Sequence, residues 1–537
     1  MVTQTGGEGA TAESAWAPLS HPVFRALWIS SLVSNIGTWM QNVGAAWAMT
    51  SLSPSPLMVA LVQSATSLPV FVVGLPAGAV ADIVDRRRLL LVTQTWMLAA
   101  AALLAVLAFV DLMTPTTLLV LTFALGIGGA MNTPTWQAIT SELVPRSELT
   151  RAVALNALPI NIGRAVGPAI GGVLVAAAGP ALVFALNAAS FVAVLAVVYR
   201  WRRQAPRALL PAERVIGATR AGLRYARHAP PLAAVLVRTG IFIVCGSAFW
   251  ALLPVIARRD LGLSALGYGL LLTCFGFGAV VGAALLPRVK RRFTVDAVVA
   301  LATVLFALVS ALTAFWRFIP GLGIAMMLGG VAWIALMASL NGAAQTAVPA
   351  WVRARALGIY LLVFQGGLGV GSALWGLAAQ HVGVSIALSS SAAAAILGLA
   401  AILRWPLREI TMRDLTPSAL WPEPHLDVVP APDEGPVRVE VEYRVDPLQA
   451  HAFVEAIHDL EPIRRRDGAV MWAVYQDPGQ KGRYVESFVV ESWLEHLRQH
   501  ERATVGDRTV QERIRRFHIA GAPPSVTHLI AAKFRSP

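Results

Sequence analysis

The chain has 537 residues, of which 56% are hydrophobic and only 14% are charged, whereas soluble domains contain about 45–50% apolar and about 25% charged residues. A soluble core cannot bury this much apolar surface, so the composition predicts a protein that spans a lipid bilayer. The net charge of +13 does not indicate a nucleic-acid partner, because the basic residues of the apolar region stand in short clusters between apolar runs. The two cysteines, Cys245 and Cys274, give neither a disulfide framework nor a zinc motif.

The first 410 residues consist of two halves that repeat at a constant offset of 204 residues, without a gap. Because the repeated residues are almost wholly apolar, each half is predicted to be a bundle of membrane helices. Two parallel bundles related by an axis along the membrane normal are the plan of a transporter, with the substrate path between them. The recurring pairs include Gly74 and Gly278, Gly78 and Gly282, Gly126 and Gly330, Gly163 and Gly367, and Gly179 and Gly383.

Residues 1–21 form a polar N-terminal tail, and the apolar run that follows is long enough to act as its own insertion signal. A span needs about 20 mostly apolar residues, and each half contains six such runs. The sequence therefore predicts an all-α polytopic membrane protein with twelve transmembrane helices in two six-helix parallel repeats. The runs are 24–50, 57–81, 89–110, 116–142, 152–177 and 180–200 in the N-terminal bundle (22–200), and 232–256, 264–287, 296–315, 321–347, 355–379 and 383–403 in the C-terminal bundle (231–408).

The arginines gather on one side of the predicted bundle. With both termini in the cytoplasm, the cytoplasmic side receives Arg86–Arg88, Arg288–Arg292 and the basic central loop 201–230. The positive-inside rule then predicts a multi-pass protein of the cytoplasmic (inner) membrane with both termini inside. The arginines of the central loop have the spacing of an interfacial helix on the anionic inner leaflet. The opposite side receives only Arg258, Arg259 and Arg317.

The composition changes after residue 408. Residues 409–436 contain prolines and acidic residues, which predicts a stiff extended linker. Residues 437–537 carry 15 basic and 14 acidic residues, a net charge of +1, and predict a soluble module that regulates the bundle or dimerises. The element order βαββαβ indicates a ferredoxin-like α+β domain on the cytoplasmic side. The expected strands are 437–445, 469–475, 484–490 and 526–531, and the expected helices are 447–466 and 492–517.

The loop after the second predicted helix contains Gly78, Asp82 and Arg86. A small residue, an acid at the helix end and arginines in a tight loop can make a charge-paired latch against a neighbouring helix. The pattern resembles the loop 2–3 signature of the major facilitator superfamily, in which the glycine lets helices approach and the acid and arginine hold the cytoplasmic gate. Asp85 stands where that family more often has glycine, and Leu286 replaces Asp82 in the second half. The alternative is that the arginines only set the membrane topology.

The fifth predicted helix contains four glycines and a proline within ten residues. They would weaken a soluble helix, but in a bilayer they permit close backbone approach and a kink. The pattern resembles the antiporter signature of facilitator-superfamily exporters, although the upstream glycine of that signature falls on Ala154. The resemblance favours export over uptake, and the alternative is a plain packing seam of small residues. The motif consists of Gly163, Gly167, Pro168, Gly171 and Gly172.

Arg164 lies in the middle of the same helix, near the expected bilayer midplane. A charge at this depth is costly and is a functional site by default. No acid is expected at this depth, so Arg164 would meet backbone carbonyls, the neighbouring Asn161 or an anionic ligand. Structural anchoring and contact with the substrate are both open interpretations.

Other polar residues recur on single faces of otherwise apolar helices. Such residues more often join helices than contact a ligand, but a group that converges on the centre would line a substrate cavity. The candidates are Asn35, Thr38 and Asn42 in the first helix, Asn132 and Trp136 in the fourth, and Asn161 and Arg164 in the fifth.

No ATP-binding loop is found, since Lys290, Lys481 and Lys533 are the only lysines and all lie outside a G-x-x-x-x-G-K-[ST] motif. An ion gradient is the expected energy source, most simply protons, although no acid at the midplane is available to carry one. We expect no cofactor, no metal site and no catalytic residue. His496 and His500 are four residues apart, but no third ligand stands at a metal-binding spacing, so a solvated or interface face is predicted.

Four strings along the chain are distinctive enough to compare with known families: NTPTWQ at 132–137, NIGRAVGP at 161–168, RRRDGA at 464–469 and SWLEHLRQH at 492–500. They closely resemble the transmembrane-secretion-effector branch of the major facilitator superfamily, which is related to the enterobactin exporter. The resemblance covers nearly the whole chain beyond the first 20 residues. It implies export of siderophores, drugs or related small amphiphiles. The tail is similar in pattern to dimeric monooxygenase-like α+β barrels, but it has no recognisable catalytic set.

The sequence therefore predicts a secondary transporter, not an enzyme, that exports a small amphiphilic cargo from the cytoplasm by proton antiport and alternating access. The expected partners are the cargo, the lipid bilayer and protons, with dimerisation through the C-terminal domain as a further possibility. Two other interpretations stay open. One is an uptake facilitator or symporter of the same fold, and the other is a membrane-tethered enzyme or sensor that acts through the C-terminal domain.

Overall fold

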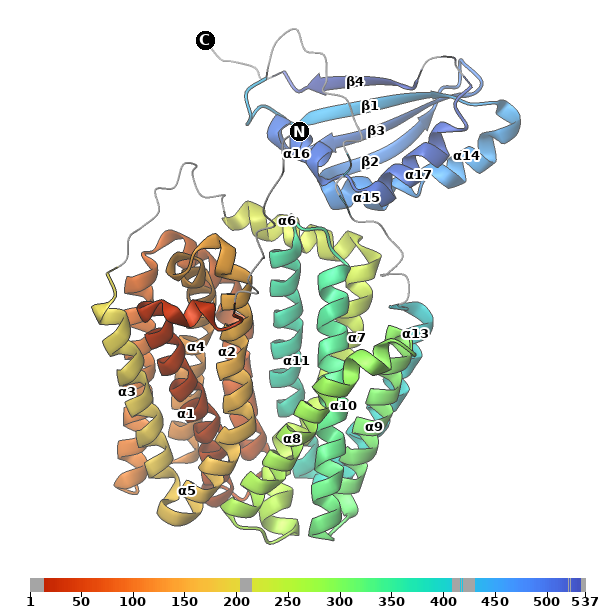
Figure 1. The fold of residues 1–537 in the computed structure, drawn as a ribbon. Helices are drawn as coiled ribbons and strands as arrows, with labels where there is room; N and C mark the ends of the chain where they lie inside the picture. The colour runs from red at the N-terminus through yellow and green to blue at the C-terminus, as the bar shows by residue number, and fades with distance from the viewer. Residues whose placement is uncertain are drawn as a thin grey trace, which may run out of the picture.

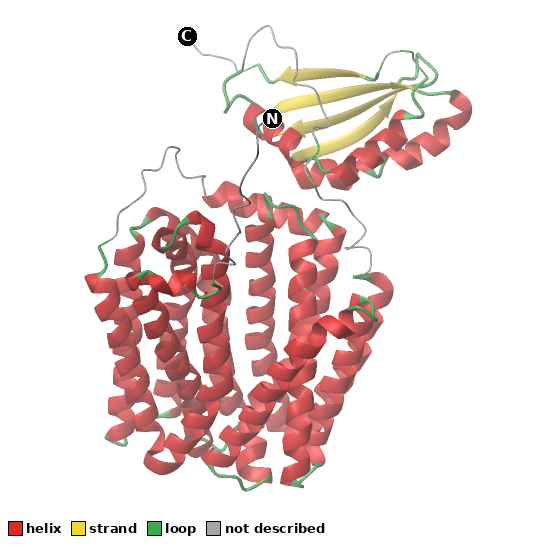
Figure 2. Cartoon of the chain, viewed as in Figure 1, coloured by secondary structure: helices red, strands yellow, loops and turns green. Residues whose placement is uncertain are grey.

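The computed structural model describes residues 14–202, 215–407, 416, 418, 430–519, 521 and 523–532, and within them it does not describe the side chains of 75, 79, 82, 83 and 215–221. Long helices form a bundle, and a smaller domain with the sheet lies beyond one end of it (Figures 1 and 2). We call this smaller domain the tail. The end of the bundle that faces it is the tail side, and the opposite end is the far side.

The N-terminal half of the bundle contains five helical segments. Three of them begin with proline as the first helical residue, where the missing N–H costs no hydrogen bond. The last segment turns sharply at Gly179, whose φ of 76° and ψ of 175° lie outside the helical region, and glycine adopts such a positive φ without strain. The segments are α1 (Pro22–Leu52), α2 (Pro56–Ile83), α3 (Arg86–Phe109), α4 (Pro115–Leu143) and α5 (Leu149–Arg200).

The C-terminal half follows the same plan after a short helix on the tail side. Gly383, with a φ of 88°, separates α11 from α12 and is the counterpart of Gly179 at the offset of 204. The repeat predicted from the sequence is therefore also present in the backbone. The segments are α6 (Val215–His228), α7 (Pro230–Val255) with a π-helical turn at Ile256–Asp260, α8 (Ala265–Lys290), α9 (Val295–Phe315), α10 (Ile319–Thr346), α11 (Arg353–Val382), α12 (Val384–Leu397) and α13 (Ala401–Arg404).

Ten segments of the described chain are long and apolar enough to cross a membrane. The segment Arg146–Arg200 counts once among them although it contains the turn at Gly179, and α1 is not one of the ten. Each of the twelve apolar runs expected from the sequence overlaps a helix. The bundle thus has the length and composition of a multi-pass membrane protein.

The two halves meet mainly through two helix pairs, α2 with α11 and α5 with α8, with further contacts of α7 with α2 and α1. A Cβ atom on Gly172 would lie 2.8 Å from the carbonyl oxygen of Ala265, and one on Gly269 would lie 2.7 Å from the carbonyl oxygen of Pro168. Only glycine permits the backbones of α5 and α8 to approach this closely. In the other pair, the Ser64 hydroxyl donates a hydrogen bond of 2.7 Å to the carbonyl of Gly369.

The tail contains one antiparallel sheet in the order β2-β3-β1-β4. Its helices all cover one face of this sheet, the face toward the bundle (Figure 1). In β1 the burial alternates residue by residue, as expected for a strand with one covered face. The elements are β1 (Val437–Arg444), α14 (Ala450–Ile457), α15 (Leu460–Asp467), β2 (Ala469–Gln476), β3 (Arg483–Val490), α16 (Trp493–Arg502), α17 (Val505–Arg515) and β4 (Ser525–Ile530).

A buried ion pair crosses the core of the tail. The Arg464 guanidinium donates hydrogen bonds of 2.8 and 3.2 Å to the two carboxylate oxygens of Glu486, whose side chain is fully buried. The Trp472 indole N–H donates a third bond to this carboxylate at 3.0 Å. Since a buried carboxylate is costly unless it is paired and hydrogen-bonded, these three bonds are what permits Glu486 in the core.

The prediction that His496 and His500 lie on a solvated or interface face is wrong for His496, which is 1% exposed. Its ring centroid lies 4.8 Å from that of His500 and 4.7 Å from that of His528 on β4, because α16 packs this face against the sheet. Among the described residues, no group of histidine, cysteine, aspartate and glutamate side chains has a geometry that could hold a metal ion.

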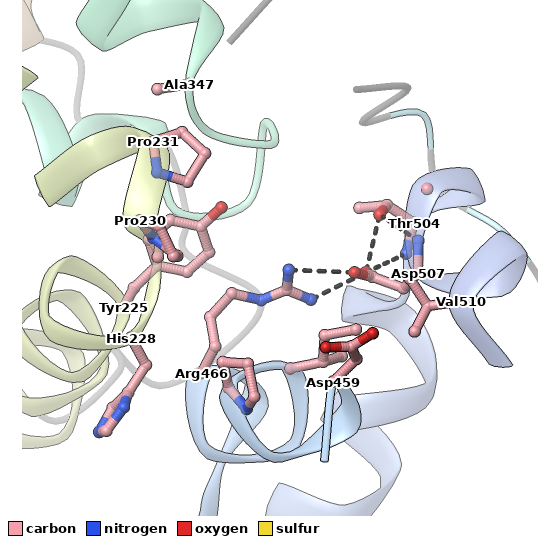
Figure 3. Close-up of a pocket in the computed structure, with 14 residues that line it drawn as sticks. Tyr225, His228, Pro230, Pro231, Ala347, Asp459, Arg466, Thr504, Asp507 and Val510 are labelled. Carbon is pink, nitrogen blue, oxygen red and sulfur yellow. Dashed lines mark hydrogen bonds and ion pairs between the residues drawn. The ribbon is translucent and has the colours of Figure 1, made fainter. Parts of the chain in front are cut away.

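The tail is docked on the central helix α6 and on the loop before α11. Arg224 of α6 donates a hydrogen bond of 2.7 Å to Glu495 of α16, and both side chains are mostly buried. The Arg502 guanidinium lies 4.6 Å from the ring centroid of Trp351. A cavity of about 330 Å³ remains between tail and bundle, and in Figure 3 Tyr225 lies on its α6 side and Arg466 and Asp507 on its tail side.

We expect the tail to lose stability as the pH falls below about 6.5. Burial and the neighbouring histidines lower the pKa of His496 to about 3, and burial lowers the pKa of His500 to about 4. Histidines of an unfolded chain titrate near 6.5, so between these values the unfolded state binds protons that the folded state does not. The free energy of unfolding therefore decreases by up to about 1.4 kcal/mol per histidine and pH unit.

Hydrogen–deuterium exchange of the β1 and β3 amides in the full chain, corrected for the intrinsic pH dependence of exchange, measures this loss. His496→Phe should reduce the pH dependence, and the exposed His451→Gln serves as the matched control. An unchanged pH dependence in His496→Phe would contradict the assignment.

Candidate functional site

A cavity of about 470 Å³ lies between the two halves of the bundle. Its walls come from α1, α2 and α5 of the N-terminal half and from α7, α8, α10 and α11 of the C-terminal half. It therefore occupies the position that the repeat predicts for a substrate path.

The two walls of this cavity differ in chemistry. The N-terminal half contributes the polar side chains of Asn42, Gln63, Thr66 and Arg164. The C-terminal half contributes aliphatic residues, the amides of Asn341 and Gln365, and a group of aromatic rings that contact one another. The ring centroids are 4.9 Å apart for Trp250 and Phe275 and 5.3 Å apart for Trp250 and Trp333. The cavity thus has its cation on the N-terminal side and most of its aromatic rings on the C-terminal side. The further aromatic residues of this wall are Tyr268, Tyr360 and Phe364.

Arg164 lines the cavity with its guanidinium 5.4 Å from the ring centroid of Trp39. Within the described part of the chain, no carboxylate pairs with it and its buried Nε finds no acceptor. Trp250 on the opposite wall likewise has a buried indole N–H without an acceptor among the described residues. Buried donors normally have a partner, so this cavity has the donors to bind a molecule that carries acceptor oxygens or a negative charge.

The glycine motif of α5 packs this helix against two neighbours. A Cβ atom on Gly163 would lie 2.9 Å from the carbonyl carbon of Asn35, one on Gly167 would lie 2.5 Å from Cβ of Trp39, and one on Gly171 would lie 3.0 Å from Cα of Met40. These three glycines therefore let α5 approach α1, whereas Gly172 lets α5 approach α8 of the other half. Pro168 lines the central cavity.

The polar residues proposed as cavity lining separate into three groups. Asn42 and Arg164 line the central cavity. Asn35, Thr38, Asn42 and Asn132 line a second cavity of about 310 Å³ inside the N-terminal half. Neither cavity includes the other two: Trp136 packs in a hydrophobic cluster with Leu27 and Leu90, and the Asn161 amide donates to the carbonyl of Ala157 at 3.0 Å.

Sequence reasoning missed the aromatic wall of the central cavity. Trp250, Trp333 and Phe364 lie in runs that read simply as apolar, although Gln365 directly follows Phe364 and lines the same cavity. The signal that would have found two of them is the repeat, because Trp250 corresponds to Ala46 and Trp333 to Gly129 at the offset of 204.

On the tail side, Arg86 at the start of α3 is held by the end of α4. Its guanidinium donates a hydrogen bond of 2.8 Å to the Glu142 carboxylate and one of 3.1 Å to the carbonyl of Ala138. The side chain of Asp82, the acid of the expected latch, lies outside the described residues. A Cβ atom on Gly78 would meet nothing within 4 Å, so in this conformation Gly78 is not needed for close helix packing.

On the far side, two arginines of the π-helical turn after α7 bind the end of α1. The Arg258 guanidinium donates to the hydroxyls of Thr50, at 3.0 Å, and of Ser51, and it lies 5.3 Å from the ring centroid of Trp47. Arg259 donates a hydrogen bond of 3.3 Å to the carbonyl of Ser53. Cations are favourable at the C-terminal end of a helix, so these arginines hold the two halves together on this side.

Two duplicated helical halves with a cavity between them define a membrane transporter. The chain belongs to the transmembrane secretion effector family of the major facilitator superfamily, whose sequence profile matches residues 13–536. The resemblance found in the sequence is thereby confirmed.

The chain is similar to several characterised relatives. It is 26% identical over 270 residues to the staphyloferrin A transporter of Staphylococcus aureus, a match that covers 49% of this chain and 66% of the relative. It is 25% identical over 269 residues to the enterobactin exporter of Salmonella typhi, covering 49% and 63%. The chain thus spans slightly less than two thirds of these two relatives. It is 24% identical to the multidrug efflux pump Tap of Mycolicibacterium fortuitum over 397 residues, 71% of this chain and 96% of the pump.

Solved structures show the same fold of the bundle. A bacterial homologue of the human lysosomal transporter Spinster, in an inward-facing and unoccupied conformation, matches with a TM-score of 0.55 and 14% identity over 72% of this chain and 96% of that chain. A POT family transporter in complex with 5-aminolevulinic acid matches with a TM-score of 0.59 and 13% identity over the same shares.

We expect the effects of Arg86→Ala and Glu142→Ala on stability to be non-additive. Each substitution removes one partner of the same ion pair, so the double variant should be less destabilised than the sum of the single variants by on the order of 0.5–1 kcal/mol. Thermal unfolding in detergent measures this. The exposed Arg88 provides the control, since Arg88→Ala combined with Glu142→Ala should be additive. Full additivity of the Arg86 cycle would refute the pairing.

We also expect Arg258→Ala to weaken the closure of the far side, because it removes the hydrogen bonds to Thr50 and Ser51 and the contact with Trp47. Spin labels on the loops that join α1 to α2 and α7 to α8 should show a broader distance distribution with a longer component. Arg317→Ala is the control, since Arg317 on the same side pairs only loosely with Asp260, at 3.6 Å. Identical distributions in both variants and wild type would refute the role of Arg258.

Proposed function

We propose that this protein is a secondary active transporter that exports small amphiphilic molecules, such as siderophores, drugs or secondary metabolites, from the cytoplasm. The observation that supports this most is the two-sided cavity between the halves, with Arg164 on one wall and an aromatic surface on the other. A cargo with an anionic or acceptor-rich part and an aromatic or apolar part fits both walls. The names of the similar proteins, two of them siderophore transporters and one a multidrug pump, agree with such a cargo.

The proposal includes a topology of twelve spans. The segment Arg146–Arg200 is long enough, at 55 residues, to cross the membrane twice with its turn at Gly179, and α1, with 31 residues, is long enough to be the first span. The arginine-rich loops lie on the tail side, so the positive-inside rule places that side and both termini in the cytoplasm of a cell with this protein in its inner membrane.

The remaining domains follow from this topology. Residues 1–21 are an N-terminal tail, 22–200 and 231–408 are the bundles, 201–230 is the central loop and 409–436 is the linker. The sheet order β2-β3-β1-β4 with helices on one face supports a ferredoxin-like assignment for 437–537. The opposite face of the sheet is not covered by the helices of the tail (Figure 1), and we assign to it the dimerisation expected for this domain.

Transport by alternating access is supported by where the halves touch. The close contacts described between α5 and α8, and between Arg258 and α1, lie from the far side to about the middle of the bundle. Near the tail side, α2 has open space at Gly78. We propose that this arrangement is a state open to the cytoplasm, in which α2 and α11 still touch at Gly74 and Leu362. Closure of the tail side would then engage Gly78, Asp82 and Arg86 as the gate.

We assign the energy source to a proton gradient, with protons entering as cargo leaves. The glycine motif of α5 supports antiport by its resemblance to the exporter signature, and Gly172 of this motif lies at the contact with α8, on which the halves can rock. In this proposal the tail regulates transport through its contacts with α6 and carries no catalytic activity.

We expect substitutions of Arg164 to separate anionic from neutral cargo. Arg164→Lys keeps the charge but loses the planar fork, so it should weaken recognition of an anionic cargo without disturbing assembly. Arg164→Ala should lower export of the anionic cargo by about tenfold or more, equivalent to a loss of at least 1.4 kcal/mol, and should spare a neutral dye. Efflux from loaded cells, measured for one anionic and one neutral fluorescent compound, tests this beside thermal stability in detergent.

The outcomes of this experiment discriminate between the interpretations. Equal losses for both cargoes together with a large fall in melting temperature would show that Arg164 is a structural anchor. Energy-dependent accumulation of the dyes in place of efflux would favour uptake on the same fold. Leu368, which lines the same cavity at the position equivalent to Arg164, provides the matched control as Leu368→Ala, and it should affect both cargoes to a similar degree.

A further inference from the structure

Arg164 carries its charge into the interior of the bundle, on the wall of the central cavity. No carboxylate among the described residues pairs with it, and its buried Nε atom has no acceptor among them either. The group that faces the guanidinium is the indole ring of Trp39 on α1, whose centroid lies 5.4 Å from the guanidinium carbon. A cation within about 6 Å of a ring centroid is attracted to the face of the ring. The described partner of Arg164 is therefore an aromatic ring without a net charge.

The contact between α1 and α5 determines this pairing. A Cβ atom on Gly167 would lie 2.5 Å from Cβ of Trp39, so the two helices touch where the Trp39 side chain begins. Arg164 precedes Gly167 by three residues on α5, and residues with this spacing share one face of a helix. The side chains of Trp39 and Arg164 consequently start next to each other, and both line the central cavity.

The C-terminal half shows that the fold itself needs neither side chain. At the offset of 204 residues, Trp39 corresponds to Ile243 and Arg164 to Leu368. The glycines of the helix contact are the same in both halves, Gly163 with Gly367 and Gly167 with Gly371. Ile243 and Leu368 are buried in one hydrophobic cluster, with 0% and 8% of their surface exposed. The ring and the cation of the N-terminal half thus replace an apolar pair as a unit, which indicates a function of the pair and not a requirement of packing.

Stacking on a ring leaves the guanidinium able to bind an anion. The ring contacts the flat face of the guanidinium, whereas the N–H groups point outward in its plane. A carboxylate partner from the protein would occupy these donors and cancel the charge, but an indole ring does neither. A guanidinium whose plane is fixed can donate two parallel hydrogen bonds to a carboxylate, and it loses less conformational freedom when the cargo binds.

We propose that Trp39 is a positioning residue for cargo recognition. Its ring holds the Arg164 guanidinium with the donor edge toward the cavity, so that the site selects cargo with a carboxylate group. The inference rests on the proposed function, and it names the chemical group by which the cargo is recognised. Cargo without a carboxylate still contacts the aromatic rings of the C-terminal half, but it gains nothing from the pair of Trp39 and Arg164.

The experiment measures binding to the purified full chain in detergent, with dansylglycine and its amide as probes. Both compounds carry the same aromatic ring and only dansylglycine has a carboxylate, so the ratio of the two dissociation constants isolates the contribution of the anionic group. Fluorescence polarisation gives both constants. Trp39→Ile introduces the residue of the C-terminal half and should lower the preference for dansylglycine by roughly threefold or more. Trp39→Phe keeps the face of a ring and should lose less.

A second set of variants tests whether Trp39 acts through Arg164. Arg164→Leu also introduces the residue of the C-terminal half, and it should remove most of the preference for dansylglycine. In this background Trp39→Ile should change the preference no further, because the ring has no cation left to position. A role of Trp39 in packing alone would not give this dependence.

Trp47→Ile is the matched control. Trp47 is another tryptophan of α1 that pairs with an arginine, with the Arg258 guanidinium 5.3 Å from its ring centroid, but it is not one of the residues that line the central cavity. This variant should keep the preference of the wild type for dansylglycine.

Three results would overturn the inference. The first is an unchanged preference in Trp39→Ile. The second is an equal loss of affinity for both probes together with a lower melting temperature, which would show that Trp39 only packs. The third is an effect of Trp39→Ile that persists beside Arg164→Leu. Each of these leaves export itself untouched, whereas failure of the wild type to bind either probe would count against the proposed cargo class, and the inference would fail with it.

Discussion

The backbone contact between α5 and α8 is the constraint on which the geometry of the bundle depends. Gly172 and Gly269 bring the two helices so close that a side chain on either would collide with the opposite backbone. The halves are thereby joined toward the far side, where Arg258 adds charged contacts to the end of α1. Pro168, whose carbonyl lies at this contact, also lines the central cavity.

The two halves share a backbone plan but differ in what fills it. Arg164 and Leu368 occupy equivalent positions and line the same cavity, so at this pair of positions one wall is cationic and the other apolar. Gly129 and Trp333 are equivalent as well, and this exchange turns an aromatic interior into an open polar one. Duplication alone would give two similar walls. The difference in chemistry between the walls thus depends on a few substitutions at equivalent positions of the two halves, and not on their shared backbone.

Much of the fold could be predicted from the sequence, because the bilayer demands long apolar runs and the glycines mark where helices touch or turn. Gly179 and Gly383 stand at equivalent positions of the repeat, and the backbone turns at both. The site was predicted less well. Asn42 and Arg164 line the central cavity, whereas Trp136, which stands beside polar residues in the same way, packs in a hydrophobic cluster. Periodicity places a residue on a face of a helix, but it does not tell which neighbour that face meets.

Spacing does not reveal the ion pairs that join residues distant along the chain. The loop motif placed Asp82 and Arg86 in one latch. The partner of Arg86 that the structure describes is Glu142, on another helix and 56 residues away, and the side chain of Asp82 lies outside the described residues. In the tail, the burial of the histidines could not be predicted from the sequence either. Spacing gave His496 and His500 one helical face, but only the position of β4 determines that His528 closes over it and that the pKa of His496 falls.

Three charged side chains, Arg224, Glu495 and Arg502, connect the tail to the bundle. Burial alone would raise the pKa of Glu495, but the hydrogen bonds and charges of Arg502 and Arg224 outweigh it and lower this pKa. Glu495 therefore stays ionised and ties α16 to α6, while Arg502 lies over Trp351 before α11. On the bundle, the described contacts of these three side chains lie on the central helix α6 or on the C-terminal half. Because α6 itself packs on α7 and α11, a movement between the halves would carry the tail and α6 with the C-terminal half.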